Sequence, residues 1–127
     1  MKPAAWRLLA LLLVAPGRAA AATPGSDARE AERLHQLGLA HAAERTFEGR
    51  RRAITELERA TLLDPSRSAY WLDLGRLCLE AGHRSRGRSC YERATQVTPD
   101  DAEAQTLLGM AWKWEWLSSF DDAALVR

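Results

Sequence analysis

The chain has 127 residues, of which 46% are hydrophobic and 28% charged, and its formal net charge is +1. This length corresponds to one small domain at most. The near-neutral charge gives no strong field for nucleic acid or an anionic membrane, so we expect neither as a partner. The two cysteines are too few for a small fold built on disulfides.

The first 22 residues have the layout of a secretory signal peptide. Two basic residues precede an apolar run at residues 8–15, a Pro-Gly pair interrupts it, and alanines at 19–22 offer A-x-A cleavage sites. The pattern favours cleavage after Ala22, with Ala21 as the alternative site and an uncleaved anchor as the alternative interpretation. We expect an exported protein, in the periplasm or cell envelope of a bacterium or otherwise secreted, which touches the membrane only through residues 1–22.

Beyond residue 22 the sequence predicts helices only. Residues 23–33 form a linker and the start of the first helix, and no strand-like alternation follows. Short connections between the helical segments predict antiparallel neighbours. The expected helices span about residues 27–41, 49–63, 68–81, 84–97 and 100–117, with a sixth that starts at Phe120.

Local signals set the ends of these helices. Two D-x-x-E pairs, which begin at Asp27 and Asp100, are typical of capping boxes at helix starts. Pro65 and Pro99 end the helices before them, because the residue before a proline avoids helical backbone angles. Gly82 stands where a helix-terminating glycine is expected.

A pattern of 34 residues recurs along the chain. Its complete copy reads W-x2-L-G and, sixteen residues past the glycine, Y-x2-A-x4-P, at Trp71, Leu74, Gly75, Tyr91, Ala94 and Pro99. One period upstream, Leu57, Ala60 and Pro65 repeat the second half; one period downstream, Leu108 and Gly109 repeat part of the first half. A fixed period of this size indicates an array of small stacked units.

This pattern resembles the tetratricopeptide repeat family, whose unit is a helix–turn–helix of 34 residues. The resemblance covers about residues 34–127 and implies an all-α fold of antiparallel helix–turn–helix repeats, stacked as a short right-handed superhelix (an α-solenoid) of about two and a half to three repeats. The repeats would span about residues 34–67, 68–101 and 102–127, the last one incomplete. The family's packing and turn positions are occupied by Leu37, Gly38, Ala60, Pro65, Trp71, Leu74, Gly75, Gly87, Tyr91, Ala94, Pro99, Leu108, Gly109 and Trp112.

The outer copies depart from the complete one. Gly38 lies fifteen residues before Ala53, three more than separate Gly75 from Gly87, and the third copy has the same longer spacing if its second helix opens at Phe120. This third copy lacks most of its second helix and the polar capping helix that such arrays need. We therefore expect a fragment of a longer repeat protein, or an uncapped C-terminal end that a partner or another copy covers.

The resemblance also implies how the protein works. In this family the concave surface, lined by first helices, commonly holds an extended peptide, so we expect a scaffold with a protein or peptide partner. The groove positions of this chain combine apolar and basic side chains, which suits hydrophobic anchors and an acidic group. They are His35, Leu39, Leu72, Arg76, Met110, Lys113 and Trp114. The clamp of chaperone-binding members is absent, because Asp73 and Glu103 stand where it has asparagine and lysine.

Three tryptophans and two arginine clusters each allow two interpretations. Trp112 falls in a packing position of the family. Trp114 and Trp116 belong either to an aromatic contact surface or membrane-interface belt, or to packing against further helices downstream. The arginines within 50–52 and 84–88 fit solvated helix faces better than phosphate binding, because acidic residues are interspersed nearby.

No catalytic, cofactor-binding or metal-binding pattern stands out, so we expect no enzyme activity, no cofactor and no metal site. Cys78 and Cys90 fall on the two helices of one unit, either as two buried thiols or as a disulfide. The alternative function is that of an accessory repeat segment in a longer envelope protein, whose catalytic or transport domain would lie beyond Arg127.

Overall fold

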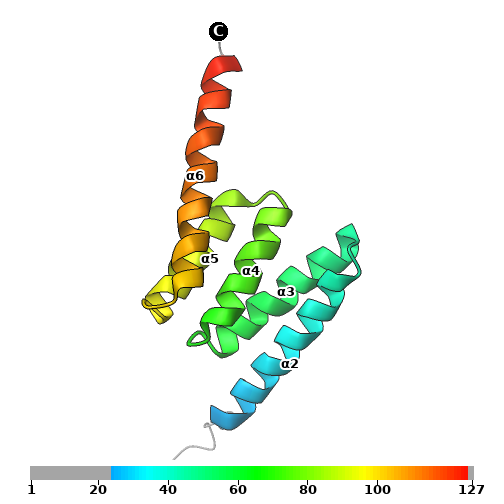
Figure 1. Ribbon diagram of the computed structural model, residues 1–127. Coiled ribbons are helices and arrows are strands. Elements are labelled where there is room, and N and C mark those ends of the chain that lie inside the picture. Colours follow the sequence, from blue (N-terminus) through cyan, green and yellow to red (C-terminus); the bar gives the residue numbers. More distant parts are fainter. Residues whose placement is uncertain (1–23, 126–127) are drawn as a thin grey trace, which may run out of the picture.

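The computed structural model describes residues 24–125, and the side chains within 25–121; the expected signal peptide lies outside this part of the chain. The described residues form five α-helices and no strand (Figure 1): α2 (Pro24–Ala43), α3 (Phe47–Leu63), α4 (Ser68–Glu80), α5 (Arg84–Val97) and α6 (Ala102–Leu125). Each helix packs on the next, so that α2–α3 and α4–α5 are hairpins and α6 follows them. The expected all-α fold of stacked hairpins is confirmed.

Helices α4 and α5 cross closely at two glycines. A Cβ atom added to Gly75 would lie 2.7 Å from Cε1 of Tyr91 and 3.1 Å from the Gly87 carbonyl oxygen; one added to Gly87 would lie 2.9 Å from the Gly75 carbonyl oxygen. The Tyr91 ring is buried and fills the space beside the crossing. Because any side chain at either position meets backbone or this ring, only glycine fits the crossing without a shift of its neighbours.

The first hairpin uses the same geometry with different residues. A Cβ atom added to Gly38 would lie 3.1 Å from Cγ of Leu57 and 3.3 Å from the Ala53 carbonyl oxygen. Both Ala53 and Leu57 are fully buried. They therefore take the places that Gly87 and Tyr91 have in the second hairpin.

The three additional residues of the first copy lengthen α3, which has 17 residues where α5 has 14. The turns that precede the two helices match, because Arg45 (φ 54°) and Gly82 (φ 85°) each lie seven residues past the crossing glycine. Positive φ is uncommon for a residue other than glycine. The additional turn thus lies at the start of α3, where the Thr46 hydroxyl accepts a hydrogen bond from the Gly49 N–H at 2.9 Å.

One core runs through the stack in three clusters. Tyr70 of α4 lies beside Leu34 and joins the second hairpin to the first. Leu57 and Cys78 belong to the cluster shared by α3, α4 and α5, and Tyr91 to the cluster that reaches α6. Each large apolar side chain buried in this way contributes about 1.5–3 kcal/mol, so the hairpins hold one another in place.

Helix α6 packs on the second hairpin through one face. The residues that meet Leu72, Tyr91 and Ala94 have helical spacing and are Ala104, Leu107, Leu108 and Ala111. At its start, the Gln105 side chain donates to the Pro99 carbonyl oxygen, as Trp71 Nε1 donates to the Pro65 carbonyl oxygen at the start of α4 (2.9 Å). The first turns of α4 and α6 are therefore anchored in the same way.

The predicted break near residue 117 and the sixth helix at Phe120 are wrong, since α6 continues to Leu125. Trp116 stands seven residues past Gly109, where the hairpins have their positive-φ residue, a conformation disfavoured for a bulky side chain. The Ser119 hydroxyl donates to the Trp116 carbonyl oxygen at 2.6 Å and so does not cap a new helix. Gly109 accordingly faces open space, and no helix of the described residues crosses it.

Helix ends differ from the sequence prediction at two capping boxes and agree with it at one glycine. Helix α2 already begins at Pro24, so Asp27 lies inside its first turn. Asp101 instead of Asp100 caps α6, because its carboxylate accepts hydrogen bonds from two backbone N–H groups of the first turn, at 2.9 and 3.3 Å. Gly82 follows α4 in the left-handed conformation, as predicted.

Trp112 is not a core residue, which corrects the sequence-based expectation. It is 50% exposed, and the Arg88 guanidinium lies 4.3 Å from the centre of its ring. Arg88 also pairs with Glu115 at 3.2 Å, so an arginine covers one face of the ring where the family pattern has a packed helix. Leu37, another predicted packing residue, is likewise 36% exposed.

The close crossing of α4 and α5 predicts opposite effects of one substitution at two glycines. Gly75→Ala forces the Tyr91 ring or the α5 backbone to move and lowers the free energy of unfolding by about 1–3 kcal/mol. Gly109→Ala, in the open interior of α6, raises it by about 0.5–1 kcal/mol through helix propensity. Urea unfolding of both variants measures the difference; equal effects at the two sites would contradict the crossing.

Candidate functional site

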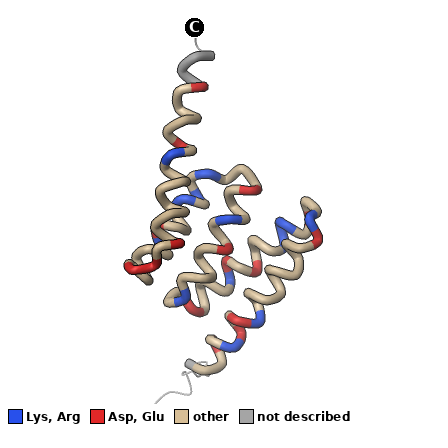
Figure 2. The backbone as a smooth tube through the Cα atoms, in the orientation of Figure 1, with Lys and Arg blue, Asp and Glu red and all other residues tan. Residues whose placement is uncertain are grey.

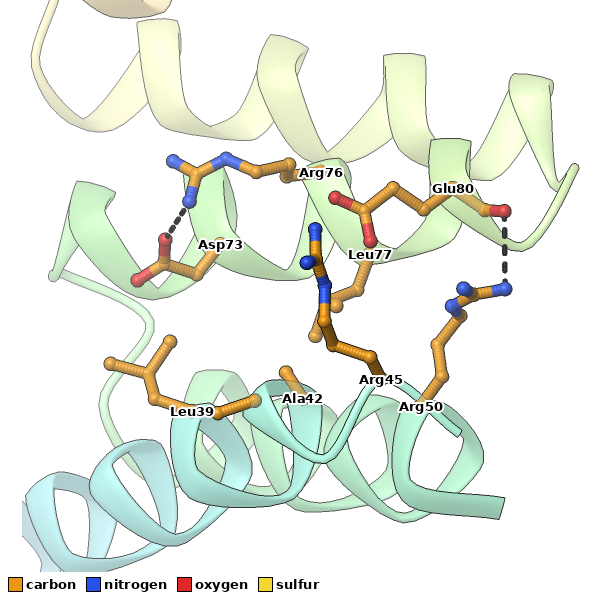
Figure 3. A pocket seen from close by; sticks show the side chains of 9 residues that line it. Leu39, Ala42, Arg45, Arg50, Asp73, Arg76, Leu77 and Glu80 are labelled. Atoms are coloured by element: carbon orange, nitrogen blue, oxygen red, sulfur yellow. Dashed lines mark hydrogen bonds and ion pairs between the residues drawn. The ribbon is translucent and has the colours of Figure 1, made fainter. Parts of the chain in front are cut away.

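The first helices of the stack, α2, α4 and α6, form a groove with two hollows. The first hollow, of about 550 Å³, lies between the end of α2 and α4 (Figure 3); it is lined by Leu39, Ala42, Ala43, Arg45, Arg50, Asp73, Arg76, Leu77 and Glu80. The second, of about 370 Å³, lies between α4 and α6 and is lined by Leu79, Glu80, Arg84, Ala111 and Trp114. Glu80 borders both hollows, so they form one surface, which we call the first-helix groove.

One face of α4 supplies the floor and one wall of the first hollow. Asp73, Arg76, Leu77 and Glu80 follow at helical spacing and therefore point to the same side. Leu77 is buried at the base, whereas the Arg76 side chain is half exposed. Arg45, which has a positive φ in the α2–α3 turn, extends its side chain across the hollow from the opposite side (Figure 3).

Positive charge exceeds negative charge in this groove. Its lining contains four arginines, Arg45, Arg50, Arg76 and Arg84, and two acidic residues, Asp73 and Glu80. Asp73 is already paired, with Arg76 at 3.2 Å and with His35 at 2.7 Å. Arg50 donates to the Glu80 backbone carbonyl oxygen at 3.4 Å, and the Arg45 side chain extends into the hollow toward Leu77 and Glu80 (Figure 3). The groove therefore suits a ligand with carboxylates.

A polar network between α2 and α4 underlies the groove. His35 Nε2 lies 2.7 Å from Asp73 Oδ2, and the Tyr70 hydroxyl donates to Glu32 at 2.8 Å. The His35 and Tyr70 rings are in contact, with 4.7 Å between their centres. Burial and the hydrogen bond to Glu32 raise the pKa of Tyr70 to about 12. These contacts fix how α2 lies against α4 and thereby set the width of the first hollow.

The structure brings together only some of the sequence-predicted groove residues. Leu39, Arg76 and Trp114 line the hollows. His35 and Leu72 were expected to be accessible to a peptide, but both are buried: His35 beneath the groove, Leu72 in the core beside α6. Met110 and Lys113 are exposed on α6 and line neither hollow.

Sequence reasoning missed Arg45 and Glu80 in the groove. A signal for Arg45 was present, since it lies as far past Gly38 as Gly82 lies past Gly75 and therefore occupies the turn. Glu80 ends α4 on the same face as Asp73, Arg76 and Leu77, which the register of that helix alone implies.

Cys78 and Cys90 are free, buried thiols in one core cluster. The hydrogen bond between them and burial raise the pKa of Cys78, and the same bond lowers that of Cys90. Within the described part of the chain, no group of three or more His, Cys, Asp or Glu side chains is placed to hold a metal ion. Among the same residues, no helix is long and apolar enough to cross a membrane.

Comparisons with known proteins agree with this architecture. The sequence model of the tetratricopeptide repeat family matches residues 50–111, which run from α3 to α6. Superkiller complex protein 3 of Mus musculus is 35% identical over 81 residues, 61% of this chain. The chain spans only 5% of that protein's length.

Two solved structures share the fold. The crystal structures of MamA and of MamA protein both have a TM-score of 0.62 and 24% identity to this chain. The similar regions cover 69% and 72% of this chain, and 50% and 48% of theirs. The chain thus spans about half the length of these structures.

The raised pKa of Tyr70 predicts a stability that depends on alkaline pH. The folded state keeps the Tyr70 proton up to about pH 12, whereas the unfolded chain loses it near pH 10. The stabilisation is therefore present below pH 10 and is lost as the pH rises toward 12. Denaturant unfolding at pH 9, 10 and 11 is expected to show a smaller decrease in the free energy of unfolding for Tyr70→Phe than for the wild type. If the free energy of unfolding fell equally with pH in the wild type and in Tyr70→Phe, the raised pKa would not belong to Tyr70.

Proposed function

We propose that this protein is a tetratricopeptide-type scaffold that binds a protein or peptide partner in the first-helix groove and catalyses no reaction itself. The observation that carries the proposal is the groove: two joined hollows with a surplus of arginine and an apolar base at Leu77. The family match over residues 50–111 and the shared fold support it, because stacked helical repeats present such extended surfaces for binding.

The partner we propose is an extended peptide segment with apolar side chains next to a carboxylate. An apolar side chain would enter the hollow between α4 and α6, against Leu79, Ala111 and Trp114. A carboxylate would reach Arg76 and Arg45 in the neighbouring hollow, where charge-assisted hydrogen bonds favour it. The polar network fixes α2 against α4, and the core cluster around Tyr91 fixes α6 against the second hairpin. The two positions therefore keep a fixed spacing, which lowers the entropic cost of binding.

We also propose that the scaffold acts outside the cytoplasm. The support is the sequence pattern of residues 1–22: two basic residues, an apolar run and alanine-rich cleavage sites. N-terminal sequencing of the protein recovered from the envelope or medium tests this proposal. A new N-terminus at Thr23 or Ala22 is expected, and recovery of the intact N-terminus in the cytoplasmic fraction would contradict it.

A second candidate is an accessory repeat segment within a longer protein. The similarity to mouse Superkiller complex protein 3 favours this candidate, because the similar region makes up only 5% of that protein's length. A reading frame that continues into a catalytic or transport domain would support this candidate, and a frame that ends at Arg127 would contradict it.

The groove proposal predicts the chemistry of selected peptides. Selection from a random peptide library on the immobilised protein is expected to enrich peptides that combine an aromatic or aliphatic residue with a nearby acidic residue. Arg76→Gln is expected to weaken their binding about tenfold or more, because it removes the charge that a carboxylate meets. Trp114→Ala is expected to weaken it through loss of apolar contact.

The matched control for this experiment is Arg59→Gln, which removes an exposed arginine of α3 outside the groove lining. It is expected to leave peptide affinity unchanged, and circular dichroism checks that each variant is folded. Peptides that bind Arg76→Gln and Trp114→Ala as tightly as the wild type would overturn the groove as the binding site.

A further inference from the structure

A second groove lies on the side of the second helices. It has a volume of about 590 Å³ and runs between the first half of α3 and the start of α5. Phe47 and Ile54 contribute apolar surface, and Arg51, His83 and Arg86 border it. Phe47, which is 80% exposed, belongs to the additional turn of α3. We call this surface the outer groove.

The outer groove is positively charged. Its lining has three arginines, at positions 50, 51 and 86, against the single carboxylate of Glu58, which is already paired with Arg86. The first turn of α5 contains no acidic side chain, and its N-cap His83 makes no side-chain cap. The partial positive charge of these helix amides therefore adds to that of the arginines. In Figure 2 the blue of Lys and Arg marks the starts of both α3 and α5.

The end of α6 bears a negative charge, in contrast to the positively charged outer groove. Trp116, Leu117 and Phe120 are exposed by 61%, 44% and 55%, and the carboxylate-bearing Asp121 next to them is exposed as well. The Trp116 and Phe120 rings meet edge to face, with 4.6 Å between their centres, so they form one apolar pair. We call these four residues the α6 end; they combine aromatic anchors with negative charge.

From this complementarity we infer that the α6 end of one copy docks in the outer groove of a second copy. The two surfaces of one chain share no residue: the α6 end borders a hollow with Arg84 and Trp114, whereas none of these residues lines the outer groove. Helix α6 projects beyond the second hairpin (Figure 1). The Trp116–Phe120 pair would cover Phe47 and Ile54, and Asp121 would approach the arginines. Exposed aromatic surface is the usual source of affinity in such contacts, and charge complementarity sets the orientation.

This contact is head to tail, so each copy keeps one free α6 end and one free outer groove. Such interfaces generate rings or open chains in place of closed dimers. The inference goes beyond the proposed function because it uses neither hollow of the first-helix groove. Of the residues in the outer groove, only Arg50 also lines the first-helix groove, and the experiment leaves it unchanged.

Sedimentation velocity over a range of protein concentrations tests the inference by a charge exchange. The wild type is expected to form species larger than a dimer as the concentration rises. Arg51→Glu and Asp121→Arg are each expected to raise the concentration needed for assembly about tenfold or more, because like charges then face one another. The double variant Arg51→Glu with Asp121→Arg restores complementarity and is expected to recover assembly.

Two further variants separate the contact from non-specific aggregation. Phe47→Ala is expected to weaken assembly by removing a wall of the groove, whereas Arg29→Glu, an exposed position near the start of α2, is expected to leave it unchanged. A wild type that stays monomeric throughout, or that assembles equally well with Arg51→Glu, would overturn the inference. So would a double variant no better than the single ones, or a monomer whose outer groove instead binds an acidic peptide or nucleic acid. None of these results bears on peptide binding in the first-helix groove.

Discussion

The close crossing of α4 and α5 is the contact on which the other features depend. Gly75 and Gly87 let the two backbones approach until each carbonyl oxygen lies only 2.9–3.1 Å from where the other residue's Cβ would be. Tyr91 completes the crossing on one side and contacts the cluster that holds α6 on the other. Because α4 is locked in rotation by this contact, its Asp73–Glu80 face turns toward the groove between the first helices.

The chemistry of the first-helix groove depends on this packing of α4 on α5. Packing fixes α4, and the His35–Asp73 and Tyr70–Glu32 contacts then fix α2 against it. Arg76 of α4 and Arg45 of the α2–α3 turn therefore border one hollow of defined width (Figure 3). Arginines and apolar side chains make up most of the groove lining, and the arginines give the groove its positive charge. Different residues therefore serve the fold and the groove: buried glycines, alanines and tyrosines hold the stack, and exposed arginines line the groove in which we propose that a partner binds.

The regular unit and the helices were predictable because their signals are local and periodic. The 34-residue spacing assigned Trp71, Gly75, Tyr91 and Pro99 to one helix–turn–helix unit. Gly82 indicated the turn within this unit, because glycine readily adopts a positive φ. The predictions that were wrong concern residues whose environment depends on which helices pack against them, and local sequence patterns do not show this. Trp112 is exposed because no described helix packs on it, and Leu72 is buried because α6 does. Ser119 resembled a helix cap, but without a residue suited to positive φ before it the helix continued.

Amide hydrogen exchange, measured at a concentration where the protein is monomeric, tests the central claim most directly. If the crossing of α4 and α5 is what the stack depends on, the slowest exchange is expected at residues 74–78 and 88–94, around Gly75 and Tyr91. The α6 residues from Trp114 to Asp121, which pack on one side only, are expected to exchange much faster. Protection of that part of α6 equal to that of α4 and α5 would contradict the account.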